Sequence, residues 1–335
     1  MKKYILTTIL LVSTIWSFAQ TLTCWTGGNW NKPTPTDIYR IPTISTINIA
    51  AYASFCNPSQ GKYNWVVIDE DLANCARYHK SAIVSVVLNS KCPEWFKNTI
   101  PDSVPYFIDV RGQGKIFEST IPIPYNDNYV AYCTGFIKAL ADHLKLNPTT
   151  YNLITGVGFG AIGNTTLEIK LPNDSTNPLS TNAIKVWTDY GYTPKKVIKT
   201  FNSIRNCYMN NFSTKNIIID VISLDDMPVV NGDTTNVVLE MLRICGSASN
   251  PGRYQFKYTS LTPMYNGKMT NLIKSYGLQA IIQTNPLVFG ECGSTPCDPT
   301  GFNQAIRLAK FYGVIQIELQ IQVINNYKYQ VLNYK

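Results

Sequence analysis

Short runs of apolar and β-branched residues recur along the chain, separated by stretches with helical spacing. Alternating strands and helices favour a parallel sheet, and eight strands are the number that closes a (β/α)8 barrel. We therefore predict an α/β protein with the TIM-barrel architecture. The predicted strands are Ile47–Ala53, Ala82–Leu88, a weaker run at Tyr106–Val110, Tyr151–Val157, Ile217–Ile222, Tyr254–Leu261, Ala280–Thr284 and Val314–Ile321.

Apolar residues at helical spacing fill the segments between these strands. The segment Trp65–Tyr78 carries three acids in its first turns, as expected for a helix amino end. The same period predicts helices at Tyr129–Leu144, Thr193–Met209, Asn236–Ile244, Lys268–Tyr276 and Gly301–Tyr312. The segment Cys92–Tyr125 has five prolines and little periodicity, so we predict a long loop over the barrel mouth with a short, irregular third strand.

The amino terminus has the layout of a secretory signal, with Lys2 and Lys3, an apolar stretch to Phe18 and small residues before Gln20. We predict a cleaved signal peptide at 1–19 and a single barrel domain at 20–335, secreted or periplasmic and without membrane insertion after cleavage. Loss of the two lysines lowers the net charge from +8 to +6. Because this excess is spread along the chain, nucleic acid is not an expected partner.

Nine cysteines in an exported chain permit disulfides, with an odd one left over. Cys292 and Cys297 flank a tight Gly-Ser-Thr-Pro loop, and we predict a disulfide between them. The chain has no Cys-x-x-Cys or His-Glu-x-x-His pattern, so no metal site is predicted.

Strand parity predicts which side chains point into the barrel. In Val314–Ile321 the isoleucines and leucine share one face, which should pack on helices, so Glu318 should lie inside. The same parity places Gln255, Lys257 and Thr259, then Gln283 and Asn285, and Asp220, on the inner face. A carboxylate there is a candidate catalytic group, because desolvation tunes its pKa. The alternative is a structural ion pair of Glu318 or Asp220 with Lys257.

Gly158–Gly163 has the spacing of a dinucleotide fingerprint, but the helix that such a site requires is not predicted after it. We expect no cofactor, and we expect these glycines to let a loop cross the barrel mouth close to a ligand. Aromatic residues also gather in predicted loops. Trp95, Tyr125 and Trp187 are candidate sugar-stacking residues, with Asn285 and Lys257 as polar contacts, although for any single ring packing in the core is the more frequent role.

Several phrases together resemble the superfamily of retaining glycoside hydrolases with TIM barrels, in particular β-galactosidase-like and cellulase-like members. These phrases are Gly61-Lys62-Tyr63-Asn64-Trp65, Cys92-Pro93-Glu94-Trp95-Phe96, Ile123-Pro124-Tyr125-Asn126-Asp127 and Gly191-Tyr192-Thr193. The resemblance implies a proton donor after strand four and a nucleophile after strand seven, about 5 to 5.5 Å apart. It also implies an oligo- or polysaccharide as substrate.

This sequence departs from that pattern at both positions. No Asn-Glu pair ends strand four, and Glu168 is the first acid beyond it; the nearest acid after strand seven is Glu291. We therefore take Glu168 as the candidate acid/base, with Glu318 or Glu291 as the second carboxylate. The alternatives are a catalytically inactive barrel that binds glycan or another ligand, and a barrel that serves as an interaction scaffold.

Overall fold

The computed structural model describes residues 20–27, 31–100, 103–109, 116–163, 167–172, 183–225, 227–230, 232–284, 289 and 299–334. The predicted signal peptide lies outside these residues. Within them, no helix combines the length and the apolar character that a membrane crossing needs.

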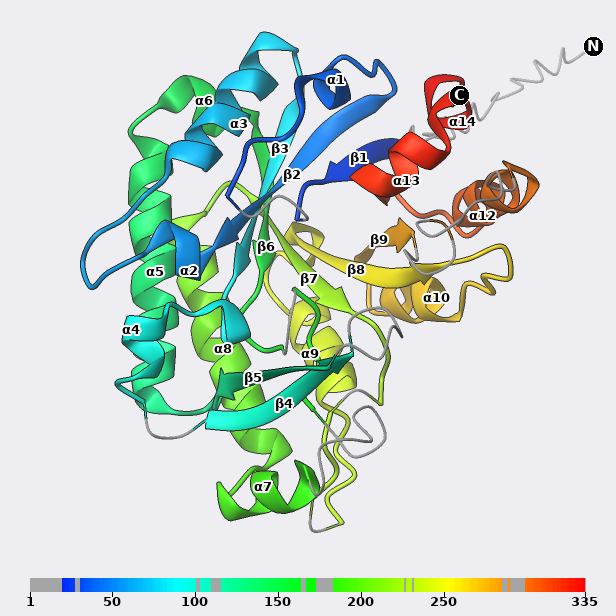
Figure 1. The fold of residues 1–335 in the computed structure, drawn as a ribbon. Coiled ribbons are helices and arrows are strands. Elements are labelled where there is room, and N and C mark those ends of the chain that lie inside the picture. The colour runs from blue at the N-terminus through cyan, green and yellow to red at the C-terminus, as the bar shows by residue number, and fades with distance from the viewer. Residues whose placement is uncertain are drawn as a thin grey trace, which may run out of the picture.

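Eight parallel strands form a closed barrel, so the predicted architecture is confirmed (Figure 1). Neighbours around the barrel are β1, β2, β3, β6, β7, β8, β9 and β10, and β10 pairs with β1 to close it. The bounds are β1 Thr21–Trp25, β2 Ile44–Tyr52, β3 Ser81–Val87, β6 Ile154–Phe159, β7 Asn216–Val221, β8 Tyr254–Leu261, β9 Gln279–Thr284 and β10 Gln316–Gln320.

Helices lie outside these strands, and the six helices expected from periodicity are present. These are α3 Val66–Arg77, α5 Asp127–Lys145, α8 Pro194–Asn211, α9 Val237–Gly246, α10 Lys268–Ser275 and α12 Pro299–Phe311. The side chain of Thr193 accepts a hydrogen bond from the Lys196 amide and caps α8, with proline next in the chain. Shorter helices are α1 Thr36–Tyr39, α2 Ala53–Cys56, α4 Glu94–Lys97, α6 Pro148–Leu153, α7 Ala183–Asp189, α13 Ile321–Asn326 and α14 Lys328–Leu332.

One predicted strand is wrong, and one barrel strand was not predicted. The strand that was missed is β1, which begins two residues after the end of the predicted signal. The run at Tyr106–Val110 belongs instead to β4, Ser103–Asp109, which pairs antiparallel with β5, Ile116–Pro122, in a separate two-stranded sheet. The hairpin satisfies the backbone hydrogen bonds of this β-prone run locally, so it takes no part in the barrel.

The barrel interior is layered. Ile83, Ile218 and Ile281 form an apolar layer, and on three strands a polar residue follows two positions later. Toward the carboxyl ends of the strands, Tyr52, Val87 and Leu167 pack together with Trp25. We call this upper group the cap; it and the isoleucine layer enclose polar side chains between them.

Candidate active site

Six strands each place one polar side chain at the same level of the barrel. These residues are Asn48 on β2, Ser85 on β3, Asp220 on β7, Lys257 on β8, Gln283 on β9 and Glu318 on β10, and all of them are buried. We call this set the central cluster. The inward placement of Asp220, Lys257, Gln283 and Glu318, predicted from strand parity, is confirmed.

Lys257 is the centre of this cluster. Its Nζ atom lies 2.8 Å from Asp220 Oδ2 and 2.6 Å from Glu318 Oε1, and 5.2 Å from the centre of the Trp25 ring. Burial alone would lower the pKa of Lys257, but the charges of Asp220 and Glu318 outweigh it and raise that pKa above the usual lysine value. Lys257 therefore stays charged and holds two carboxylates together, and it is 1% exposed, so it offers no contact to a ligand at the surface.

Hydrogen bonds engage both carboxylate oxygens of Glu318. Gln283 donates to Oε1 and Asn48 donates to Oε2, each at 2.6 Å, in addition to the lysine contact. Ser85 in turn donates to Asn48 Oδ1 at 2.7 Å and fixes that amide. A carboxylate held in this way is oriented by three strands, and we interpret Glu318 as a residue that positions Lys257.

Glu168 approaches the same cluster from the loop that follows β6. The amide of Ile169 donates to the carbonyl of Asp220 at 2.8 Å, so this loop is tied to β7 beside the cluster. Burial raises the pKa of the half-buried Glu168 carboxyl, the charge of Lys257 opposes this and that of Glu318 adds to it. Glu168 is thus a third carboxyl group whose pKa is lowered by the charge of Lys257, and it is more exposed than Asp220 and Glu318.

Two carboxylate oxygens of this site lack partners. Among the described residues, Oε2 of Glu168 and Oδ1 of Asp220 are buried without a hydrogen bond. Burial raises the pKa of Asp220 to about 7, the nearby Lys257 counteracts it, and the charges of Glu318 and Glu168 raise it further. Near pH 7 Asp220 therefore still binds part of the proton that an ordinary surface aspartate has lost, and burial shifts the pKa of Glu168 in the same direction.

The raised pKa of Asp220 makes a prediction about stability. The folded protein keeps this proton up to a pH of about 7, whereas the unfolded chain loses it near the ordinary aspartate pKa of 3.8. Protons therefore favour the folded state, and this stabilisation is complete below pH 3.8 and is lost as the pH rises to about 7. We therefore expect the difference in melting temperature, wild type minus Asp220→Asn, to decrease as the pH is raised from 5 to 7.5. A constant difference across that range would contradict the assignment.

The predicted sugar-stacking aromatics lie elsewhere. Trp187 has no exposed surface and donates its indole N–H to the Pro172 carbonyl at 2.7 Å, so it presents no face to a ligand and packs in the core. Trp95 is half-buried and donates to the Asn57 carbonyl at 2.9 Å, against Phe96 and Tyr132. Tyr125 is half-buried and donates to the Tyr190 carbonyl at 3.2 Å. Trp187 therefore cannot stack on a sugar in this structure, whereas for the half-buried Trp95 and Tyr125 the role remains a prediction.

Glu291, Asn285 and the predicted disulfide partners Cys292 and Cys297 lie outside the described residues. The other seven cysteines are unbridged. Among the residues that the structure describes, no group of three or more His, Cys, Asp or Glu side chains is arranged to hold a metal ion.

The glycines after β6 permit close approach of backbone. A Cβ on Gly160 would lie 1.7 Å from the Val86 carbonyl oxygen, and one on Gly163 would lie 2.3 Å from that of Glu168. These residues bring the Glu168 loop against β3. The described residues after β6, up to Pro172, form no helix of the kind that a dinucleotide site needs.

No protein-family model matches the sequence, and no curated protein is significantly similar to it. Solved structures do resemble the fold. The catalytic domain of the β-amylase from Paenibacillus polymyxa has a TM-score of 0.54 at 10% identity, covering 92% of this chain and 94% of its own. A xylotriose complex of an intracellular xylanase from Thermoanaerobacterium saccharolyticum has a TM-score of 0.53 at 13% identity, covering 91% and 86%. At such low identity the likeness shows the fold alone: this chain has the (β/α)8 barrel that these glycoside hydrolases have.

Proposed function

We propose that the protein is a secreted glycoside hydrolase that acts on an oligo- or polysaccharide, with Glu168 as proton donor and Asp220 as the second carboxylate. The observation that carries this proposal is the pair of unpartnered, buried carboxylate oxygens, Glu168 Oε2 and Asp220 Oδ1, around one lysine. The barrel fold shared with glycoside hydrolases supports it, and the signal-like first 19 residues support secretion.

The two carboxyls suit two different roles. Burial raises the pKa of Glu168 and so favours its protonated form, which can give a proton to the glycosidic oxygen as the bond to the sugar breaks. In its ionised form Asp220, held by Lys257, stabilises the positive charge that develops at the anomeric carbon, and a water molecule then adds to that carbon to complete the hydrolysis. Glu318 keeps Lys257 in place and shares its charge with Asp220. Without Glu318, Lys257 would pair with Asp220 alone.

Substrate must also reach Asp220, which is 2% exposed beneath the cap. Leu167 in this cap immediately precedes Glu168, so the loop that carries the proton donor also covers the second carboxylate. We infer that the sugar displaces Leu167 from Tyr52 and Val87 when it binds. This coupling would exclude water from the carboxyl pair until a substrate is present.

The substitution Asp220→Asn tests this assignment, since it keeps the shape and removes the charge. We expect release of reducing ends from xylan or starch to fall by about 10²- to 10⁴-fold. The same variant should be at least as stable as the wild type at pH 7.5, because the folded wild type must ionise Asp220 there. Full activity of Asp220→Asn would remove this residue from the mechanism, and a melting temperature well below that of the wild type would show that the loss reflects unfolding.

A glycan-binding protein without catalysis is the second candidate. Two observations favour this candidate: Asp220 is buried, and both carboxylate oxygens of Glu318 accept hydrogen bonds, so neither carboxylate is free at the surface. Such a protein would bind oligosaccharide with equal affinity as wild type and as Asp220→Asn, and the wild type would release no reducing ends.

A further inference from the structure

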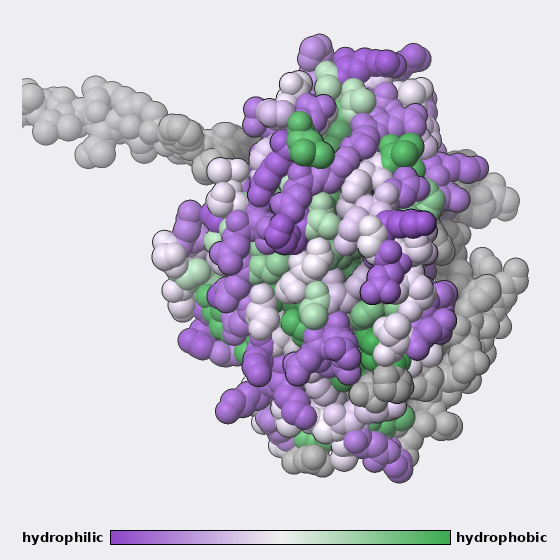
Figure 2. Space-filling model, turned by 90° about the vertical axis from the view of Figure 1, so that its left-hand side faces the viewer, coloured by the Kyte–Doolittle hydropathy of each residue, from purple (hydrophilic) through white to green (hydrophobic). Residues whose placement is uncertain are grey.

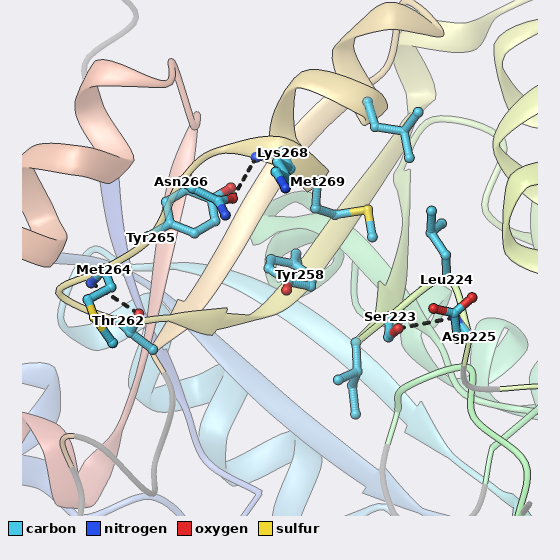
Figure 3. Close-up of a pocket in the computed structure, with 12 residues that line it drawn as sticks. Ser223, Leu224, Asp225, Tyr258, Thr262, Met264, Tyr265, Asn266, Lys268 and Met269 are labelled. Carbon is cyan, nitrogen blue, oxygen red and sulfur yellow. Dashed lines mark hydrogen bonds between the residues drawn. The ribbon is translucent and has the colours of Figure 1, made fainter. Parts of the chain in front are cut away.

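A cavity of about 390 Å³ lies at the rim of the barrel, apart from the central cluster. Residues 222–225, which follow β7, form one wall, and residues 262–266, which follow β8, form the other. The first turns of α10 complete it. Figure 3 shows Tyr258 between these walls, with Ser223 and Asp225 on one side and Thr262 and Met264 on the other.

This rim cavity is on the opposite side of β8 from the proposed active site. Lys257 and Tyr258 are consecutive on this strand, and successive side chains of a strand point to opposite faces. Lys257 points into the barrel toward Asp220 and Glu318, so Tyr258 points outward into the cavity. A molecule bound there would therefore contact none of the central cluster.

The polar groups of the rim cavity can donate hydrogen bonds. Ser223 Oγ, Thr262 Oγ1 and Asn266 Oδ1 each accept a backbone amide, from Asp225, Met264 and Lys268 respectively. These acceptors fix the side chains and leave the two hydroxyl hydrogens and the Asn266 amide N–H groups to point at a ligand. The cavity thus offers several donors held in place by the loops.

Charge and size narrow the class of ligand. Asp225 supplies one carboxylate and Lys268 one ammonium group, both exposed, so the lining has no net charge to attract an ion. The half-buried Tyr258 ring lines the cavity and packs on Tyr265 at an angle of 36°, with 6.3 Å between the ring centres, so it contributes apolar surface to the lining. Tyr265 is buried and hydrogen-bonded to Thr270, which makes it a fixed support. A volume of this size accommodates a ligand of about one or two sugar rings.

We propose that the rim cavity is a second saccharide-binding site, which holds a neutral sugar against Tyr258 with its hydroxyls on Asp225, Ser223 and Asn266. Sugars combine an apolar ring face with hydroxyls at its edge, which is the combination that this lining offers. The inference deepens the proposed function and rests on it, because it assumes that the protein acts on saccharides. It does not depend on Glu168 or Asp220.

Calorimetric titration of the Glu168→Gln protein with xylotriose and with maltotriose tests the site without consuming the sugar. In this background we expect Tyr258→Ala to raise the dissociation constant of one of the two sugars at the rim site by at least about tenfold, and Asp225→Ala by about fivefold. The matched controls are Tyr329→Ala and Asp142→Ala, which remove an exposed tyrosine and an exposed aspartate elsewhere and should change nothing.

Unchanged affinity in Asp225→Ala and in a folded Tyr258→Ala would overturn the rim site, as would the absence of saturable binding of either sugar up to about 10 mM. Asp225 is exposed, so its replacement does not endanger the fold if Tyr258→Ala proves unstable. Failure of the two proposals can be told apart. If Glu168→Gln keeps full turnover while the rim variants weaken binding, the catalytic assignment is wrong and the rim site stands.

Discussion

Replacement of Lys257 by methionine is expected to lower the free energy of unfolding by about 3–5 kcal/mol. The substitution keeps the length of the side chain but leaves Asp220 and Glu318 as buried carboxylates without a cation between them. Water cannot hydrate either carboxylate, since Asp220 is 2% exposed and Glu318 is 1% exposed. In a domain of this size such a loss lowers the melting temperature by on the order of 10 °C, which thermal unfolding followed by circular dichroism would measure.

The surface pair Lys138 and Asp142 is a matched control. Its nitrogen and oxygen are 2.5 Å apart, close to the 2.6 Å of Lys257 and Glu318, but both side chains are more than half exposed. Lys138→Met should therefore leave the melting temperature nearly unchanged, because water screens this exposed pair. The double variant Lys257→Met/Glu318→Gln should recover part of the loss, because it removes a buried charge as well. Equal destabilisation by the two lysine variants would refute the role given to burial.

Replacement of Glu168 by glutamine should lower turnover of unactivated oligosaccharide by about 10²- to 10⁴-fold, the usual contribution of a general acid. Glutamine has nearly the same shape but carries no proton to transfer. Because burial raises the pKa of Glu168, the activity of the wild type should extend to a higher pH than an ordinary glutamate would allow, and its fall at high pH should follow the loss of this proton.

Glu94→Gln is the control for this change, because that glutamate lies on α4 with its side chain 78% exposed. We expect it to retain full turnover. Initial rates of reducing-end release across a range of pH would measure both variants. Similar rates for Glu168→Gln and Glu94→Gln would exclude Glu168 as the proton donor.

The barrel and its polar interior could be predicted from sequence because both follow from local periodicity. Alternation along β10 indicated that Glu318 points inward, and the same reasoning placed Lys257 and Asp220 correctly. The hairpin of β4 and β5 could not be separated from a barrel strand, since a β-prone run does not reveal its partner. Trp187 illustrates the same limit, because loop position alone does not distinguish a buried indole from an exposed one.

The candidate site was harder to predict than the fold. Parity placed Asp220 inside, but whether its oxygen is free depends on Lys257 and Glu318, which are distant in sequence. The roles of Asn48 and Ser85 also depend on strands that meet only in the barrel. The position of Glu168 over the cluster depends on a loop whose glycines fit against β3, and only its order along the chain suggested a role.

The most direct test of the central claim compares two substrates in the Glu168→Gln variant. The rate of glycosidic-bond cleavage in the first turnover would be measured for two substrates of the same sugar. One is an unactivated oligosaccharide, and the other is a dinitrophenyl glycoside, whose leaving group needs no proton. If Glu168 is the proton donor, the rate on the first should fall by at least about 100-fold and that on the second by less than about tenfold. Equal losses on both substrates, or no loss on either, would contradict the account.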